Sequence, residues 1–303
     1  PLLFSVMVIG FGFSEAVGWR LSMVVVGVII FLIGIGYYFL TQDAPDGNYD
    51  DLRAQGKMEE KKKVTGNYMH ALKDRRVWVL FVIYGASFGI ELTVNNVAAL
   101  YFMDYFDLSL VAAGFVAASF GLMNLFARTL GGIFGDNFGA LWGLRGRSFW
   151  LFICLFFEGL ALLVFSQMQV LFLALPALIV FSLFTQMAEG ATYSVVPFIN
   201  KKALGAVAGV VGAGGNTGAV LAGFLFKNVI DWSEAFFILG LVVTAASFLA
   251  FFVRFSTRQE DEERANFAAA NIDTLRLRAA KANAALEEGL QAISDKNGRA
   301  NPA

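Results

Sequence analysis

The run VWVLFVIYGASFGIELTVNNVAALYF, residues 77–102, decides the fold of this chain. It is long enough to cross a lipid bilayer, since a spanning helix needs about 20 mostly apolar residues. Hydrocarbon offers the backbone no hydrogen-bond partners, and the run does not alternate as a barrel strand would, so it is predicted to be helical. Similar runs lie at about 20–40, 110–135, 148–166, 170–196, 203–226 and 234–254, with a truncated one at 1–15. The sequence therefore predicts an all-α membrane protein.

The composition excludes several classes of protein. Of the 303 residues 57% are hydrophobic and 16% are charged, whereas a soluble domain carries roughly 25% charged residues. This excludes a disordered chain and an ordinary soluble enzyme, and the net charge of −1 leaves no basic excess for nucleic acid. Cys154 and His70 are the only residues of their kinds. We therefore expect no disulfide within the chain, no metal site, no cofactor and no Ser/His/Asp catalytic set.

Positive charge is unevenly divided between the loops. Lys and Arg gather in segment 41–76 and in the loops near 136–147 and 197–204, whereas the loops at 103–109, 167–169 and 227–233 contain only Lys227. The positive-inside rule predicts that segment 41–76 and the C-terminus are cytoplasmic.

The tail from about 255 leaves the membrane in this interpretation. Leu286, Leu290 and Ile293 recur there at helical spacing. A solvated, partly frayed helix is the first prediction for this region, and a regulatory or docking helix is the alternative.

Arg128 is the most informative polar residue within the spans. Ala117, Gly121, Asn124 and Arg128 fall on one face of a continuous helix, which is small and polar. Arg128 lies about eight residues, or roughly 12 Å, from the end of its span. A guanidinium at that depth needs an anionic ligand or an anionic partner. We expect ligand contact, with a structural ion pair to a Glu as the alternative.

The span at 77–102 has a matching face. Tyr84, Phe88 and Glu91 are spaced by four and three residues, and Tyr84 lies roughly 12 Å deep, level with Arg128. Two aromatic rings could enclose a flat, weakly hydrated ion while the arginine supplies a two-pronged fork. Simple packing of the two rings is the alternative.

Buried carboxyls and a glycine run complete the candidate site. Burial favours the neutral form of a carboxyl, so Glu91 is the leading candidate proton carrier and Glu189 the second. Glu158, with apolar neighbours, is interpreted as a hydrogen-bonding group between helices. The run at 205–223 includes Gly215 and Asn216. It predicts either close helix packing or backbone approach to a substrate.

Several motifs resemble one family. GIFGDNFG at 132–139, followed by RGR at 145–147, is similar to the loop motif of the major facilitator superfamily. QDAPDGNY at 42–49, YGASFGIELT at 84–93, FAR at 126–128 and GAGGNTG at 212–218 resemble segments of eukaryotic nitrate transporters. The likeness covers about residues 1–255. On these motifs the chain resembles the nitrate/nitrite porter family, and within it the high-affinity eukaryotic branch.

The resemblance implies a domain arrangement. Residues 1–40 would be the end of helix 5 and helix 6 of an N-terminal bundle, 41–76 a cytoplasmic central loop, 77–254 a C-terminal six-helix bundle, and 255–303 a cytoplasmic tail. Because the chain begins at Pro1 inside an apolar run, we expect a fragment without its first helices. The resemblance also implies a location in the plasma membrane.

Site roles are implied in the same way. Arg128 matches the substrate arginine of the C-terminal half, and Tyr84 and Phe88 match aromatic residues of the nitrate site. Asn216 and its glycines, Gly215 among them, match the signature that lines the pathway, and Asn124 lies on the face of Arg128. The partner arginine of the N-terminal half is absent, so the chain would hold half of a site.

These observations predict a secondary transporter for nitrate, with nitrite as a further substrate. Uptake of an anion against an inside-negative potential costs about 2.3 kcal/mol per 100 mV. One proton per nitrate cancels that charge and a second makes uptake favourable, so we expect proton symport. An accessory membrane protein is a further partner that the family admits. The alternatives are a nitrate/nitrite or other small-anion antiporter, and a non-transporting nitrate sensor.

Overall fold

The computed structural model describes residues 2–58, 67–227 and 231–269. In these ranges the chain is helical, with one isolated β-bridge between Ala44 and Gly47 and no strand. Seven helical segments are long and apolar enough to cross a membrane. These segments are Glu15–Leu40, Arg75–Phe106, Leu110–Trp142, Leu144–Ser166, Leu171–Phe198, Lys201–Lys227 and Trp232–Phe252. The prediction of an all-α membrane protein is confirmed.

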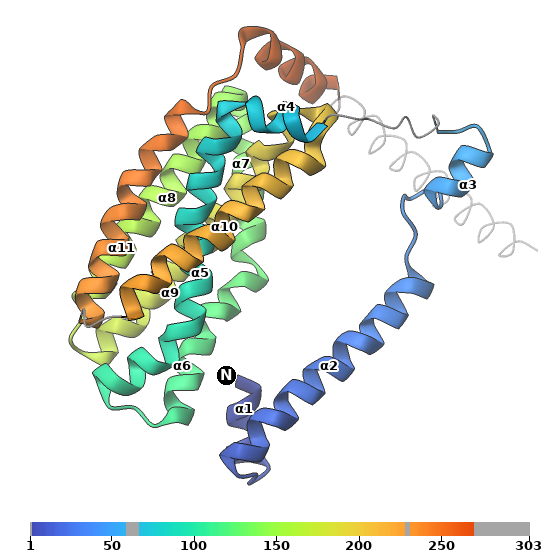
Figure 1. Ribbon diagram of the computed structural model, residues 1–303. Coiled ribbons are helices and arrows are strands. Elements are labelled where there is room, and N and C mark those ends of the chain that lie inside the picture. The colour runs from blue at the N-terminus through green and yellow to red at the C-terminus, as the bar shows by residue number, and fades with distance from the viewer. Residues whose placement is uncertain (1, 59–66, 228–230, 270–303) are drawn as a thin grey trace, which may run out of the picture.

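The first helices lie apart from the others. α1 (Leu2–Ser5) and the π-helix η1 (Val6–Gly10) are followed by α2 (Glu15–Leu40). Figure 1 shows α2 leading away from the bundle, and only Gly18 of α2 is buried. A hydrogen bond from Ser5 Oγ to the Val111 carbonyl, 3.4 Å long, ties this segment to α6.

The remaining spans form one bundle of alternating direction (Figure 1). Its helices are α5 (Arg75–Phe106), α6 (Leu110–Leu122), α7 (Ala127–Trp142), α8 (Leu144–Ser166), α9 (Leu171–Val195), α10 (Leu204–Lys227) and α11 (Trp232–Ser247). The most extensive packing is between α5 and α10, followed by α8 with α11 and α9, and α7 with α9. We call the end at which α5 begins the Arg76 end.

Glycines let α5 and α10 approach backbone to backbone. A Cβ added at Gly214 would overlap the Phe81 carbonyl oxygen, and one added at Gly218 would overlap the Gly85 carbonyl oxygen. No side chain can yield there, because backbone fills the space. For these two glycines the helix-packing interpretation is therefore confirmed.

The span predicted at 110–135 is not one continuous helix. A 3-10 turn, η2 (Met123–Leu125), follows α6, and Phe126 has φ −134° and ψ −31° before α7 begins. The prediction that Ala117, Gly121, Asn124 and Arg128 share one face of a regular helix is therefore wrong, because the break changes the rotation between the two halves.

The prediction of a loop near 136–147 is also wrong. α7 continues to Trp142, and Gly143 alone separates it from α8. Gly143 has φ +70°, a conformation that glycine adopts without strain. An ion pair between Arg147 and Asp136 joins the two helices beside this turn.

Segment 41–76, predicted as a loop, contains α3 (Tyr49–Ala54) and α4 (Asn67–Lys73). α4 packs against α10 and α5. Asp74 then caps α5 by accepting a 2.9 Å hydrogen bond from the Arg76 backbone N–H. Burial opposes ionisation of Asp74, but hydrogen bonds from Arg76 and the charges of Arg76 and Arg75 outweigh it and hold the pKa of the carboxyl below its ordinary value.

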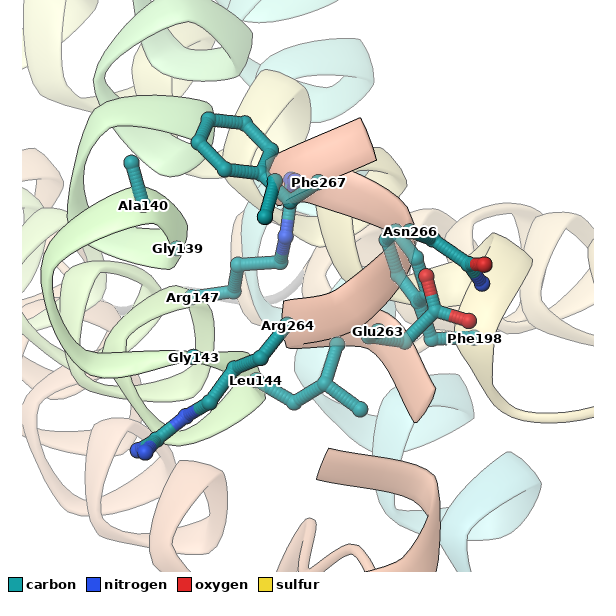
Figure 2. A pocket seen from close by; sticks show the side chains of 11 residues that line it. Gly139, Ala140, Gly143, Leu144, Arg147, Phe198, Glu263, Arg264, Asn266 and Phe267 are labelled. Atoms are coloured by element: carbon teal, nitrogen blue, oxygen red, sulfur yellow. The ribbon is translucent and has the colours of Figure 1, made fainter. Parts of the chain in front are cut away.

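A helix over 257–269 returns across the Arg76 end. Arg145 Nε forms an ion pair with Glu260 Oε1 at 2.8 Å, and Glu263 forms an ion pair with Lys201. Figure 2 shows Glu263, Arg264 and Phe267 of this helix on one side of a pocket of about 530 Å³. The helix predicted around Leu286, Leu290 and Ile293 lies outside the described residues.

Candidate functional site

Arg128 lies near the beginning of α7, directly after the break in the span. Its Nη2 donates to Glu91 Oε2 of α5 at 3.0 Å, and the same nitrogen contacts Glu189 Oε2 of α9. The two carboxyls are almost fully buried, whereas the Arg128 side chain is 37% exposed. One nitrogen of Arg128 therefore contacts the carboxyl groups of two other helices.

Amide side chains hold Glu91 in place. Gln186 Nε2 donates to Glu91 Oε1 at 2.8 Å, and Gln186 Oε1 accepts from Arg128 Nη2 at 3.2 Å. Asn124 Nδ2, in the 3-10 turn, reaches Glu91 Oε1 at 3.4 Å. Arg128 Nε is buried and has no hydrogen-bond partner. The guanidinium thus retains one buried N–H donor that its protein partners do not use.

Glycines on α7 and α9 bring the charged groups together. A Cβ at Gly190 would overlap the Arg128 carbonyl oxygen, and one at Gly131 would overlap the Met187 carbonyl oxygen. The two helix backbones touch at both positions, so Glu189, next to Gly190, meets the guanidinium directly.

Tyr84 and Phe88 also lie beside Arg128. Arg128 Cζ is 5.9 Å from the centre of the Phe88 ring, within the range of a cation–π interaction. The two rings stack on each other, with centres 5.1 Å apart and planes 8° from parallel. In this structure the rings pack on each other, and the prediction that they enclose an ion stays a prediction. Tyr193 packs edge-on against Tyr84 at 5.3 Å.

Gly215 packs against the stacked rings, whereas Asn216 lies on the surface of the bundle. A Cβ at Gly215 would overlap the Phe88 ring and lie 3.1 Å from Tyr84 Cδ1, so Gly215 makes room for the stacked rings. Asn216 is exposed, and the described structure gives it no hydrogen bond. The prediction that Asn216 lines the transport pathway stays a prediction.

A groove of about 560 Å³ opens beside Arg128. It runs along α7 and the end of α9, from Asn124 and Arg128 past Gly190 and Tyr193 to Arg147 and Phe198. Arg147 sits at the Arg76 end, where it pairs with Asp136. The groove therefore connects the Arg128 cluster with that end of the bundle, and an arginine lies at each end of it.

The third buried carboxyl is separate from the groove. Glu158 of α8 is 0% exposed, and neither of its carboxyl oxygens has a hydrogen-bond partner. The interpretation of Glu158 as a hydrogen-bonding group between helices stays a prediction, and the nearby hydroxyls belong to Ser87 of α5 and Thr185 of α9.

Gln186 is not among the site residues predicted from the sequence, although it bridges Glu91 and Arg128. Its spacing of three residues from Glu189 was the available signal. The break at 123–126 had no comparable signal. Within the described ranges, no group of His, Cys, Asp and Glu side chains could hold a metal ion.

The comparisons with known proteins identify the class. The sequence matches the Major Facilitator Superfamily over residues 2–198 and, in an overlapping match, over 91–294. The chain belongs to this superfamily of membrane transporters.

Particular relatives are nitrate transporters by name. The chain is 39% identical over 226 residues to "High affinity nitrate transporter 2.5" of Arabidopsis thaliana, a match that covers 75% of this chain and 45% of the relative. It is 36% identical over 246 residues to "Nitrate transporter 2.1" of Chlamydomonas reinhardtii, covering 78% and 45%. A "Nitrate/nitrite transporter NrtP" of Picosynechococcus is 34% identical over 167 residues, covering 53% and 30%. The chain thus spans less than half the length of these relatives.

Proposed function

We propose that this chain forms the C-terminal part of a transporter that moves nitrate, and also nitrite, across the plasma membrane together with protons. Residues 77–254 are its C-terminal six-helix bundle, 1–40 the end of the N-terminal bundle, and 41–76 and 255–303 cytoplasmic segments. The Arg76 end is then the cytoplasmic end. The named functions of the relatives and the gathering of basic residues at this end support the assignment.

The observation that carries the proposal is the pairing of Arg128 Nη2 with both Glu91 and Glu189 beside an open groove. Nitrate is flat and accepts two parallel hydrogen bonds, and the guanidinium edge formed by Nε and Nη2 donates two. Nε has no partner within the protein. Nitrate that enters the groove therefore finds Nε without a partner, and it has to displace the Glu91 and Glu189 carboxylates from Nη2.

Displacement of the two carboxylates from Arg128 couples the binding of nitrate to the uptake of protons. Among the described residues, Arg128 is the only cation that contacts Glu91 or Glu189. A buried carboxylate without a cation is costly, so each one that leaves Arg128 takes up a proton. Nitrate and protons then bind together because they depend on the same guanidinium.

The number of carboxylates sets the available driving force. An inside-negative potential opposes one nitrate by about 2.3 kcal/mol per 100 mV. One proton per nitrate removes that cost, and a second lets the potential drive uptake. Two displaced carboxylates provide for two protons.

The test is nitrate-evoked current in oocytes that express the full-length protein, with an accessory membrane protein supplied where surface expression needs it. We expect inward currents that grow as the external pH falls, and a weaker dependence on pH in Glu91→Gln, which keeps Glu189 as the second proton acceptor. Glu262→Gln, an exposed carboxyl paired with Arg258, is the matched control. Counterflow that does not depend on pH would indicate exchange, and nitrate binding without flux would indicate a sensor.

A further inference from the structure

Glu158 has no role in the proposed coupling, yet its setting is unusual. It lies in the middle of α8, is 0% exposed, and leaves both carboxyl oxygens without a hydrogen-bond partner. A carboxylate in such a place carries a penalty of several kcal/mol unless a cation or several donors accompany it.

The groups around Glu158 provide no cation. Ser87 and Glu91 approach from α5, Thr185 and Glu189 from α9, and Cys154 from one turn earlier on α8. α11 also packs on α8, and Glu234 in its first turn is its only titratable side chain. α7 contributes Arg128, which is paired with Glu91 and Glu189, and Asp136, which is paired with Arg147. In the described part of the chain, the unpaired neighbours of Glu158 are thus neutral or acidic.

Two hydroxyls link Glu158 to the paired carboxyls. Ser87 lies one helical turn before Glu91 on α5, and Thr185 lies one turn before Glu189 on α9. Ser87 Oγ donates to the Thr185 carbonyl at 3.2 Å, and Thr185 Oγ1 donates to the Phe181 carbonyl at 2.9 Å. Each hydroxyl has used its proton and still has lone pairs to accept a hydrogen bond.

A neutral carboxylic acid is the form of Glu158 that suits these neighbours. Its single O–H can donate to Ser87 or Thr185, whereas a carboxylate would find only hydroxyls that already donate elsewhere. A third negative charge in the cluster would also weaken the hold of Arg128 on any anion.

We propose that Glu158 keeps its proton throughout transport and acts as a positioning residue. As a neutral acid it fixes the Ser87 and Thr185 hydroxyls, and through them the α5 and α9 turns that present Glu91 and Glu189 to Arg128. It moves no proton itself. This inference rests on the proposed function only for its consequence on transport, because the protonation of Glu158 can be measured without nitrate.

The first test is infrared difference spectroscopy on the purified full-length protein. The carbonyl stretch of a protonated carboxylic acid should be present in the wild type at about pH 8 and absent in Glu158→Gln, although a free Glu is fully ionised at that pH. Glu262→Gln should leave the band intact. An equal intensity of the protonated-acid carbonyl band in the wild type and Glu158→Gln would mean that Glu158 is ionised and would overturn the proposal, whether or not the protein transports nitrate.

The second test separates positioning from proton carriage. Glu158→Gln keeps a donor and an acceptor and should retain nitrate uptake with the wild-type pH profile. Glu158→Leu removes the hydrogen bond and should lower the apparent affinity for nitrate about tenfold, as expected when buried polar groups lose a partner. A changed pH profile in Glu158→Gln would show that Glu158 exchanges its proton. Equal apparent affinities for nitrate in Glu158→Leu and Glu158→Gln would show that the Glu158 side chain only fills space. Either result contradicts the proposal, and the Gln variant and the spectra remain decisive if the Leu variant does not fold.

Discussion

Replacement of Gly215 by Ala tests how closely the stacked rings control the arginine. The added Cβ would overlap the Phe88 ring and lie 3.1 Å from Tyr84 Cδ1 and Cε1. Tyr84 cannot retreat, because it is 5% exposed and Tyr193 packs edge-on against it. Phe88 is only partly buried and is therefore the ring that moves.

The size of the effect follows from the distances. Phe88 has to shift by about 1 Å to regain ordinary van der Waals separation from the new Cβ. The guanidinium carbon of Arg128 now lies 5.9 Å from the ring centre, at the outer limit of about 6 Å for a cation–π interaction. Loss of this interaction costs about 0.5–2 kcal/mol, which corresponds to an apparent affinity for nitrate weaker by about 2- to 30-fold.

The assay is uptake of isotopically labelled nitrate as a function of concentration, normalised to protein at the cell surface. Gly223→Ala is the matched control, because nothing lies within 4 Å of a Cβ at that position of the same helix. Gly218→Ala shows the opposite extreme, since its Cβ meets the Gly85 backbone, and it should reduce the amount of folded protein. Wild-type affinity in Gly215→Ala would refute the link between the rings and Arg128.

Further predictions concern the charged groups. Arg128→Lys keeps the charge but loses the planar fork, and the loss of one charge-assisted hydrogen bond should weaken apparent nitrate affinity about 10- to 150-fold at normal surface expression; near-normal uptake kinetics would contradict a direct role. Glu189→Gln removes one of two proton acceptors, so the ratio of charge to nitrate moved should fall while transport persists; an unchanged ratio would exclude Glu189 from coupling. Asp74→Ala should destabilise the purified protein by about 1 kcal/mol at neutral pH in a denaturation assay, whereas Asp74→Asn keeps the helix cap and should cost less. Because the pKa of Asp74 is lowered, its charge stabilises the fold fully above the ordinary value of 3.8 and loses effect as the pH falls through the lowered value, so the difference from the Ala variant should shrink in acid.

The spans could be predicted from apolar length alone, because lipid leaves a long apolar run no alternative to a helix. Their interruptions could not. The residues around Met123–Leu125 are compatible with a helix, and their departure from it depends on tertiary packing. The end of the apolar run at residue 135 predicted a loop, yet α7 continues to Trp142, and the Arg147–Asp136 ion pair joins it to α8.

In the candidate site, too, some features could be predicted from the sequence and others could not. Counting residues along each helix predicted that Tyr84 and Arg128 lie at one level, and the structure brings Phe88 and Arg128 together. Counting gives depth but not the rotation of one helix toward another. It could not predict that Glu91 and Glu189 meet on one nitrogen of Arg128, nor that the two rings stack on each other.

Proton uptake on nitrate binding tests the shared guanidinium most directly. The purified full-length protein is held in a weakly buffered solution with a pH indicator, and nitrate is added to saturation. Displacement of Glu91 and Glu189 from Arg128 predicts uptake of about one to two protons per bound nitrate, reduced by about one in Glu91→Gln. Nitrate that binds with the same affinity and takes up no proton would contradict the account.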